Sequence, residues 1–147
     1  MDIDTGIAHI ATDPRRPTLL IVEDEFLVAI DLAGFLEQLG IEAVVATHVD
    51  EAIDRLADSG PFDAALLDVN LAGTRSWTVA RELRRRAVPF AFVTGYEADH
   101  ADIPEDLRGA PVWPKPIELD RLRSCIRQMN LLKAATARSG LEPASGS

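Results

Sequence analysis

The stretch Ala64-Ala65-Leu66-Leu67-Asp68-Val69-Asn70 decides the fold of this chain. Four apolar residues run directly into an acid, and small or polar residues follow as far as Gly73. A short continuous apolar run is typical of a strand buried on both faces, as in a parallel sheet that helices cover. Ligands bind outside the carboxyl ends of the strands in such sheets, so Asp68 lies where chemistry is expected. Taken alone, the pattern is equally compatible with an Asp68 that only starts a turn or caps the next helix.

The composition bounds the class of protein. The chain has 147 residues, of which 47% are hydrophobic and 27% charged, as expected for one globular domain with a core. The net charge of -9 disfavours nucleic acid as the main partner, because phosphate backbones select basic protein faces. No apolar run approaches the length of a membrane span and no signal-peptide layout is present, so we expect a cytoplasmic protein without a membrane partner. The single cysteine, Cys125, excludes an internal disulfide and predicts a buried, inert thiol.

Apolar runs and amphipathic segments alternate along the chain. The expected strands, including the central one, are 18–22, 41–46, 63–67, 90–93 and 111–113. The expected helices are 26–39, 50–58, 76–86 and 118–133. Such alternation predicts an α/β domain, a doubly wound parallel sheet with right-handed crossovers. We therefore expect one domain over residues 18–133, with a loose tail at 1–17 and a flexible tail at 134–147.

Two segments depart from the simple pattern. Residues 97–109 carry only a thin apolar stripe, and Pro104 interrupts it, so we expect a short or mobile element there. The predicted helix 76–86 ends in three adjacent arginines, Arg84 to Arg86. Cations suit the C-terminus of a helix, and a contact for an acidic partner is the alternative interpretation.

Four of the predicted strands end at residues that can do chemistry, namely Glu23-Asp24, Asp68, Thr94 and Lys115. Each has an ordinary explanation when seen alone, because acids favour helix starts, threonine favours strands and lysine is usually solvated. The carboxyl ends of parallel strands meet at one edge of the sheet, so these side chains are expected to converge. Their occurrence at four strand ends favours a shared function.

The expected set of groups suits phosphoryl transfer. Carboxylates at close quarters repel one another unless a proton or a cation joins them, and oxygen ligands in a partly open site suit Mg²⁺. Asp68 can then act as the nucleophile that accepts a phosphoryl group, while Lys115 supplies a cation and Thr94 a hydroxyl for its oxygens. The chain lacks a GxxxxGK[ST] loop for a nucleotide, so the phosphoryl group must come from another molecule.

These motifs together resemble the receiver domains of bacterial two-component response regulators, over roughly residues 18–133. LLIVEDE (19–25) is similar to the acidic pair after the first strand, and LLDVNLAG (66–73) to the phosphoacceptor strand and loop. FVTG (92–95) is similar to the hydroxyl position, and PKP (114–116) to the lysine-proline turn. The resemblance implies a flavodoxin-like (βα)5 fold with a five-stranded parallel sheet in the order 2-1-3-4-5.

The resemblance also implies a role for each matching residue. Asp68 is expected to be the phosphorylated aspartate, and Thr94 and Lys115 are expected to contact the phosphoryl group. The implied protein ligands of Mg²⁺ are Asp24, Asp68, the backbone carbonyl of Asn70 and Glu23, the last of these largely through water. The phosphoryl donor would be a sensor histidine kinase. The bond between Lys115 and Pro116 is expected to be cis.

The chain departs from the family pattern in three places, one of which is the step Thr94-Gly95, where the family usually has Thr-Ala or Ser-Ala. Glu23 replaces the commoner aspartate, and Val112 stands where the family usually has an aromatic switch residue, with Trp113 one place later. The run PFAFVTGY (89–96) resembles the PFxFATGY signature of a subgroup of single-domain response regulators, which is associated with histidine kinases of the HWE type. That resemblance implies that Tyr96 takes over the switch role, with Thr94.

The expected output is a change in protein contacts. We expect a stand-alone receiver, not an enzyme, that signals to a further protein or drains phosphoryl groups from a shared kinase. One alternative is a phosphatase-like hydrolase with an aspartyl nucleophile, although such enzymes typically need a second acid where this chain has Asn70. The other is a receiver-like binding module that is never phosphorylated, against which the intact set of site residues argues.

Overall fold

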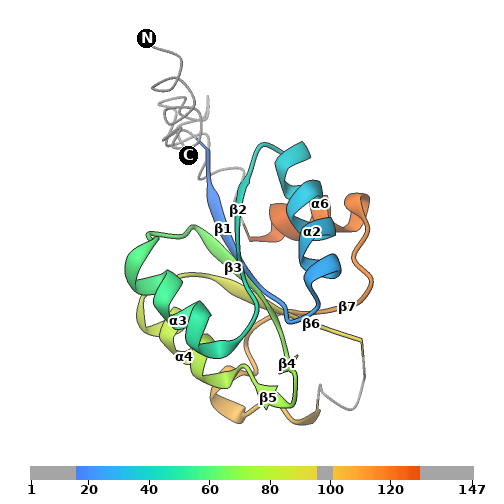
Figure 1. The fold of residues 1–147 in the computed structure, drawn as a ribbon. Coiled ribbons are helices and arrows are strands. Elements are labelled where there is room, and N and C mark those ends of the chain that lie inside the picture. Colours follow the sequence, from blue (N-terminus) through green and yellow to red (C-terminus); the bar gives the residue numbers. More distant parts are fainter. Residues whose placement is uncertain (1–15, 96–100, 130–147) are drawn as a thin grey trace, which may run out of the picture.

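A computed structural model of the chain describes residues 16–95 and 101–129, and its main feature is a five-stranded sheet. The strands lie in the order β2-β1-β3-β6-β7, and every neighbouring pair is parallel (Figure 1). Counted among themselves, these five strands have the order 2-1-3-4-5, so the predicted flavodoxin-like fold is confirmed. Their bounds are Thr18–Val22 (β1), Glu42–Ala46 (β2), Ala64–Asp68 (β3), Phe90–Thr94 (β6) and Val112–Pro114 (β7).

Four helices cover the two faces of the sheet. Figure 1 shows α2 and α6 on one face and α3 and α4 on the other. Side chains alternate along the strands, so Leu19 and Ile21 of β1 enter one apolar core while Leu20 and Val22 enter the other. The helices span Phe26–Gln38 (α2), Val49–Asp58 (α3), Trp77–Arg85 (α4) and Leu119–Gln128 (α6). None of the helices in residues 16–95 and 101–129 is long and apolar enough to cross a membrane.

The central strand β3 lies one residue later than the predicted range 63–67. Asp63 precedes the strand, and its carboxylate accepts a hydrogen bond from the backbone N–H of Thr18, at 2.7 Å. Asp68 is the last residue of the strand and pairs in register with Val93 of β6. Asp63 therefore has a structural contact at the start of β1, whereas Asp68 lies at the opposite end of the parallel strands.

A small hairpin follows β3 that the sequence patterns did not predict. Its strands are β4 (Asn70–Leu71) and β5 (Thr74–Arg75), and they pair antiparallel. The two residues of the turn, Ala72 and Gly73, have φ angles of 53° and 92°. Two positive φ angles are what a tight two-residue hairpin requires, and the Asn70 side chain closes it by accepting from the Gly73 N–H at 2.9 Å.

The segment expected to be short or mobile contains one turn of 3-10 helix, η1 (Glu105–Leu107), in its described part. Pro104 immediately precedes this turn, where a proline costs no helical hydrogen bond. The prediction of a short element is confirmed for residues 102–109, whereas 97–100 lie outside the described residues. Residues 1–15 of the predicted tail at 1–17 and the whole predicted tail at 134–147 also lie outside the described residues. The predicted end of the last helix at residue 133 is wrong, because α6 ends at Gln128 and Met129 is its C-cap.

Candidate functional site: an acidic cluster at the edge of the sheet

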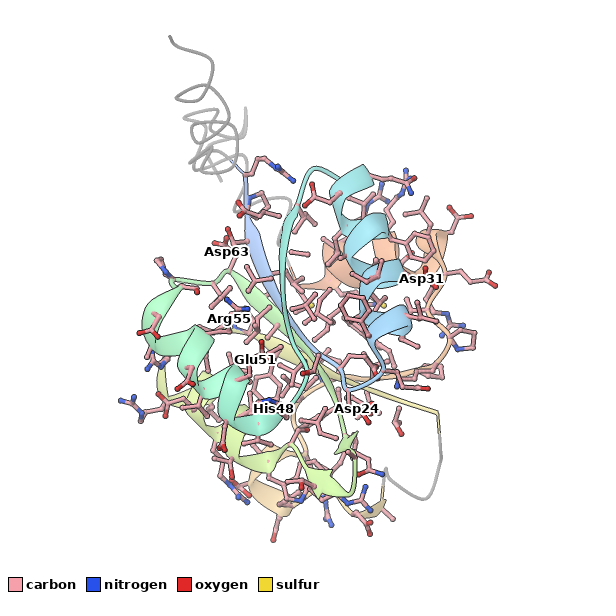
Figure 2. All side chains as sticks on the ribbon, in the orientation of Figure 1. Asp24, Asp31, His48, Glu51, Arg55 and Asp63 are labelled. Carbon is pink, nitrogen blue, oxygen red and sulfur yellow. The ribbon has the colours of Figure 1, made fainter. Side chains whose placement is uncertain are left out.

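The parallel strands place their carboxyl ends at one edge of the sheet. Glu23 and Asp24 directly follow β1, Asp68 ends β3, Thr94 ends β6 and Lys115 directly follows β7. Figure 2 shows Asp24 at the turn between β1 and α2, while Asp63, which precedes β3, lies toward the opposite edge. The order of the strands makes β1, β3, β6 and β7 successive neighbours, so groups from distant parts of the chain meet here.

Lys115 joins two buried carboxylates. Its Nζ lies 2.9 Å from Oδ2 of Asp68 and 2.8 Å from Oε1 of Glu23. Glu23 is 2% exposed and Asp68 is 8% exposed, so both acids are almost withdrawn from solvent. The backbone helps to fix the lysine, because its N–H donates to the carbonyl of Thr94 at 2.9 Å. One ammonium therefore compensates part of the negative charge of both acids.

Backbone N–H groups hold the remaining carboxylate oxygens. The N–H of Asn70 donates to Oδ1 of Asp68 at 3.2 Å, and the N–H of Glu25 donates to Oε2 of Glu23 at 3.1 Å. Each acid thus has one oxygen on a backbone amide and the other on Lys115. These contacts fix the orientation of both carboxylates before any ligand arrives.

The donor set fits a hard divalent cation. Glu23, Asp24 and Asp68 each offer a carboxylate oxygen, and these three oxygens lie within 4.8 Å of one another. All three ligands are oxygens, which suits Mg²⁺ better than a thiophilic metal. Three carboxylates against one ammonium leave net negative charge, which a divalent cation would neutralise. The residues present therefore fit the magnesium site that the sequence predicted.

Burial changes the proton affinity of the two groups at the centre. Withdrawal from water raises the pKa of Glu23 to about 7, against the opposing effects of the Lys115 ammonium and the Glu25 amide. Desolvation of Lys115 acts to lower its pKa, but its contacts with Glu23 and Asp68 outweigh this and leave the pKa raised. Lys115 is consequently a fixed cation, while Glu23 exchanges its proton near neutral pH.

The other predicted site residues are distributed as follows. Thr94 is buried at the end of β6, and Asn70 begins β4 two residues after Asp68. The peptide bond between Lys115 and Pro116 is cis. Tyr96, expected to act as a switch, lies outside the described residues.

An apolar surface beside the site was not anticipated. Three large side chains in the first turns of α2 point into solvent, with exposed fractions of 61% for Phe26, 77% for Leu27 and 45% for Ile30. We call these three residues the α2 patch. The sequence contained a signal for this patch, because Phe26, Leu27 and Ile30 are apolar but do not share the helical spacing of the residues of α2 that face the core.

A groove runs from α2 to Lys115. It has a volume of about 370 Å³ and is lined mainly by apolar side chains. Its walls include Val28, Leu32 and Phe35 of α2, and Lys115, Pro116 and Ile117 after β7. An exposed apolar surface beside a cluster of charged groups is typical of sites that bind another protein.

Comparison with known proteins agrees with this geometry. The model of the family described as the response regulator receiver domain matches residues 19–127. The sensory transduction protein LytT of Bacillus subtilis is 28% identical over 114 residues, which are 75% of this chain and 46% of LytT. The aerobic respiration control protein ArcA of Escherichia coli K12 is 28% identical over 135 residues, 87% of this chain and 56% of ArcA. The chain thus spans about half the length of these curated relatives.

The fold of this chain is also similar to solved structures of response regulators. The solution structure of SdrG from Sphingomonas melonis Fr1 is 38% identical, with a TM-score of 0.67 over 78% of this chain and 97% of that chain. A CheY-like receiver domain from Methylobacillus flagellatus has a TM-score of 0.66 over 78% of this chain and 98% of that chain. At 23% identity, the latter likeness concerns the fold alone.

Proposed function

Since the chain belongs to the response regulator receiver domain family, we propose that it accepts a phosphoryl group on Asp68 from a sensor histidine kinase. Receiver domains are signalling proteins that such kinases phosphorylate, and they bind Mg²⁺ at an acidic pocket. The observation that carries the proposal is the contact of 2.9 Å between Lys115 and Asp68 inside the cluster of three acids. This chain presents the nucleophile, the cation and the metal ligands together at one edge of its sheet.

The chemistry assigns one task to each group. An oxygen of Asp68 forms a bond to phosphorus while the bond between phosphorus and the donor nitrogen breaks, and the donor leaves with its electron pair. The Lys115 ammonium, already beside Asp68, stays near the transferred oxygens and offsets their charge. Thr94 offers its hydroxyl to the same group.

Glu23, Asp24, Asp68 and the backbone carbonyl of Asn70 would hold Mg²⁺. When bound, this cation supplies charge neutralisation for the phosphoryl oxygens. Glu23 must release its proton to bind the cation, and its pKa of about 7 makes this a step that responds to pH. Lys115 would then exchange part of its contact with the acids for contact with the phosphoryl group.

The α2 patch and the adjoining groove are the proposed contact for the kinase. A donor protein must bring its phosphoryl group to Asp68, and the groove ends at Lys115, which contacts Asp68. Phe26 follows Asp24 by two positions, so a partner that covers the patch also reaches the acidic cluster. Exposed apolar side chains of this size are otherwise unfavourable in water.

The proposed output is a change in protein contacts, by signalling to a further protein or by draining phosphoryl groups from a shared kinase. Thr94 and Tyr96 would report phosphorylation to the weak segment 97–109. The resemblance of residues 89–96 to the PFxFATGY signature supports a single-domain receiver that is served by an HWE kinase. A phosphotransfer profile against purified histidine kinases of both HWE and other types tests that assignment, and equal rates from all types would contradict it.

Incubation with acetyl phosphate and Mg²⁺ tests the phosphoacceptor directly. Mass spectrometry should find one added phosphoryl group in the native protein and none in Asp68→Asn or Asp68→Ala. The control is Asp54→Asn, which changes an exposed acid of α3 and should leave labelling intact. Undiminished labelling of the Asp68 variants would refute the assignment. Steady release of phosphate from a generic phosphate ester would instead favour the hydrolase, and absence of both labelling and magnesium binding would favour the binding module.

A further inference from the structure

Ion pairs attach residues 101–108 to the neighbouring elements β5 and α4. Nη2 of Arg75, in β5, lies 2.6 Å from Oδ2 of Asp102. Arg81, in α4, donates to both carboxylate oxygens of Asp106, from Nε to Oδ2 at 3.0 Å and from Nη2 to Oδ1 at 3.1 Å. We call the pairs Arg75–Asp102 and Arg81–Asp106 the latch. Arg84 adds a hydrogen bond to the backbone carbonyl of Asp106.

The latch lies at the rim of an apolar contact. Ile103 and Leu107 are buried in the core that also contains Val79 and Leu83 of α4. Figure 1 shows this segment, in light orange, against α4. The side chains of Asp102 and Asp106 are 54% and 57% exposed, so their ion pairs face water. An exposed pair contributes little by itself, but a bidentate arginine and a second pair on one short segment act together.

The latch also connects the segment to the loop that follows Asp68. Arg75 pairs in register with Asn70 across the β4–β5 hairpin, and the N–H of Asn70 donates to Oδ1 of Asp68. A continuous path of contacts therefore runs from the Asp68 carboxylate through Asn70 and Arg75 to Asp102. This path is separate from the one along β6 through Thr94.

We infer that the latch holds residues 101–110 against α4 and sets how readily phosphorylation of Asp68 releases them. The inference rests on the proposed function, because it concerns the output of the same site. The segment is in equilibrium between a position held against α4 and a released position. A phosphoryl group or its mimic shifts this equilibrium only by the difference in its affinity for the two states. If the latch is weaker, the released state is more populated at the start, so a lower concentration of the mimic produces the same release. Local opening of one segment has a free energy well below that of global unfolding, so an ionic contribution at its rim can shift this equilibrium.

Amide hydrogen exchange measures how often the segment held by the latch opens. The N–H groups of Leu107, Arg108 and Ala110 donate to backbone carbonyls within the segment, so their exchange reports its opening. In the variant Asp102→Asn/Asp106→Asn at low salt, these amides should exchange roughly fivefold faster than in the native chain. High salt should accelerate the native chain toward the same rate, because exposed ion pairs are screened.

The same segment supplies a matched control. Glu105 makes no ion pair with any described residue, so Glu105→Gln removes one negative charge from the same segment without touching the latch and should exchange at the native rate. Exchanging the charges in Arg81→Asp/Asp106→Arg should restore protection that each single reversal loses. Native exchange rates in the double asparagine variant, or equal acceleration in Glu105→Gln, would overturn the latch.

Titration with beryllium fluoride and Mg²⁺ tests the link to Asp68. The beryllium fluoride concentration that gives half of the maximal increase in amide exchange rate should be up to about fivefold lower in Asp102→Asn/Asp106→Asn than in the native chain. Equal half-maximal concentrations would overturn the coupling while acetyl phosphate still labels Asp68. A native chain that neither labels nor responds to beryllium fluoride would instead overturn the proposed function, and the coupling with it.

Discussion

Lys115 Nζ lies 2.9 Å from Oδ2 of Asp68, although 47 positions separate the two residues in the chain. The same nitrogen lies 2.8 Å from Oε1 of Glu23, which makes this lysine the electrostatic centre of the site. Two acids that are both largely buried would repel each other without it. The side chain that is proposed to contact the phosphoryl group thus also stabilises the site before phosphorylation.

Replacing Lys115 with methionine should destabilise the protein. The change leaves Glu23 and Asp68 without their counter-ion, at an expected loss of about 1–3 kcal/mol in the free energy of unfolding at pH 8. The loss should be smaller at pH 6, because Glu23 can then take up a proton, and Mg²⁺ should restore part of it. Urea denaturation at both pH values measures this. Arg123→Met, which alters an exposed cation of α6, should change the stability by less than about 0.5 kcal/mol.

Magnesium binding should strengthen as the pH rises toward neutrality. The Glu23 pKa is raised to about 7, so below that pH a proton competes with the cation for this carboxylate. The affinity should therefore rise by up to about tenfold per pH unit below pH 7 and level off above it. Calorimetric titration between pH 5.5 and pH 8.5 checks the profile. In Glu23→Gln the binding should be weaker and this part of the pH dependence should vanish; an unchanged profile would contradict the role of Glu23.

Truncation of a side chain in the central strand should be costly. Leu67 is fully buried in β3, one residue before Asp68. Leu67→Ala should lower the free energy of unfolding by about 2–5 kcal/mol, because it removes apolar contacts and leaves a cavity. Chemical denaturation measures the loss. The exposed residue Leu27 provides the comparison, since Leu27→Ala should change the stability by no more than about 0.5 kcal/mol.

The α2 patch should matter for the kinase and not for folding. Combined replacement of Phe26, Leu27 and Ile30 by alanine removes exposed apolar area that contributes little to the core. Phosphotransfer from the cognate kinase should slow at least about tenfold, while labelling by acetyl phosphate stays at the native rate. Comparing the two donors on the same variant checks this. Equal slowing with both donors would mean that the change disturbs the site itself.

Much of the architecture could be predicted from local pattern. Strand β1 has the bounds predicted for it, and the positions of the other main strands agree to within two residues. Apolar runs that are short and continuous leave few alternatives to a buried strand, and polar or charged residues such as Glu23 and Asp68 mark where they end. The β4–β5 hairpin escaped prediction because its strands are two residues long and carry no period. Its turn also places Ala72 at a φ of 53°, a conformation that alanine seldom adopts.

The sequence by itself determined which residues could take part in the chemistry, because the ends of apolar runs are visible in the order of residues. Only the tertiary structure decided that Lys115 contacts both Glu23 and Asp68, and that Arg81 meets Asp106 across 25 positions. It also decided that the α2 patch stays in water beside the site. The physical reason is that periodicity records which face of an element is buried. The partner of a charged side chain depends instead on which elements the closed core brings side by side.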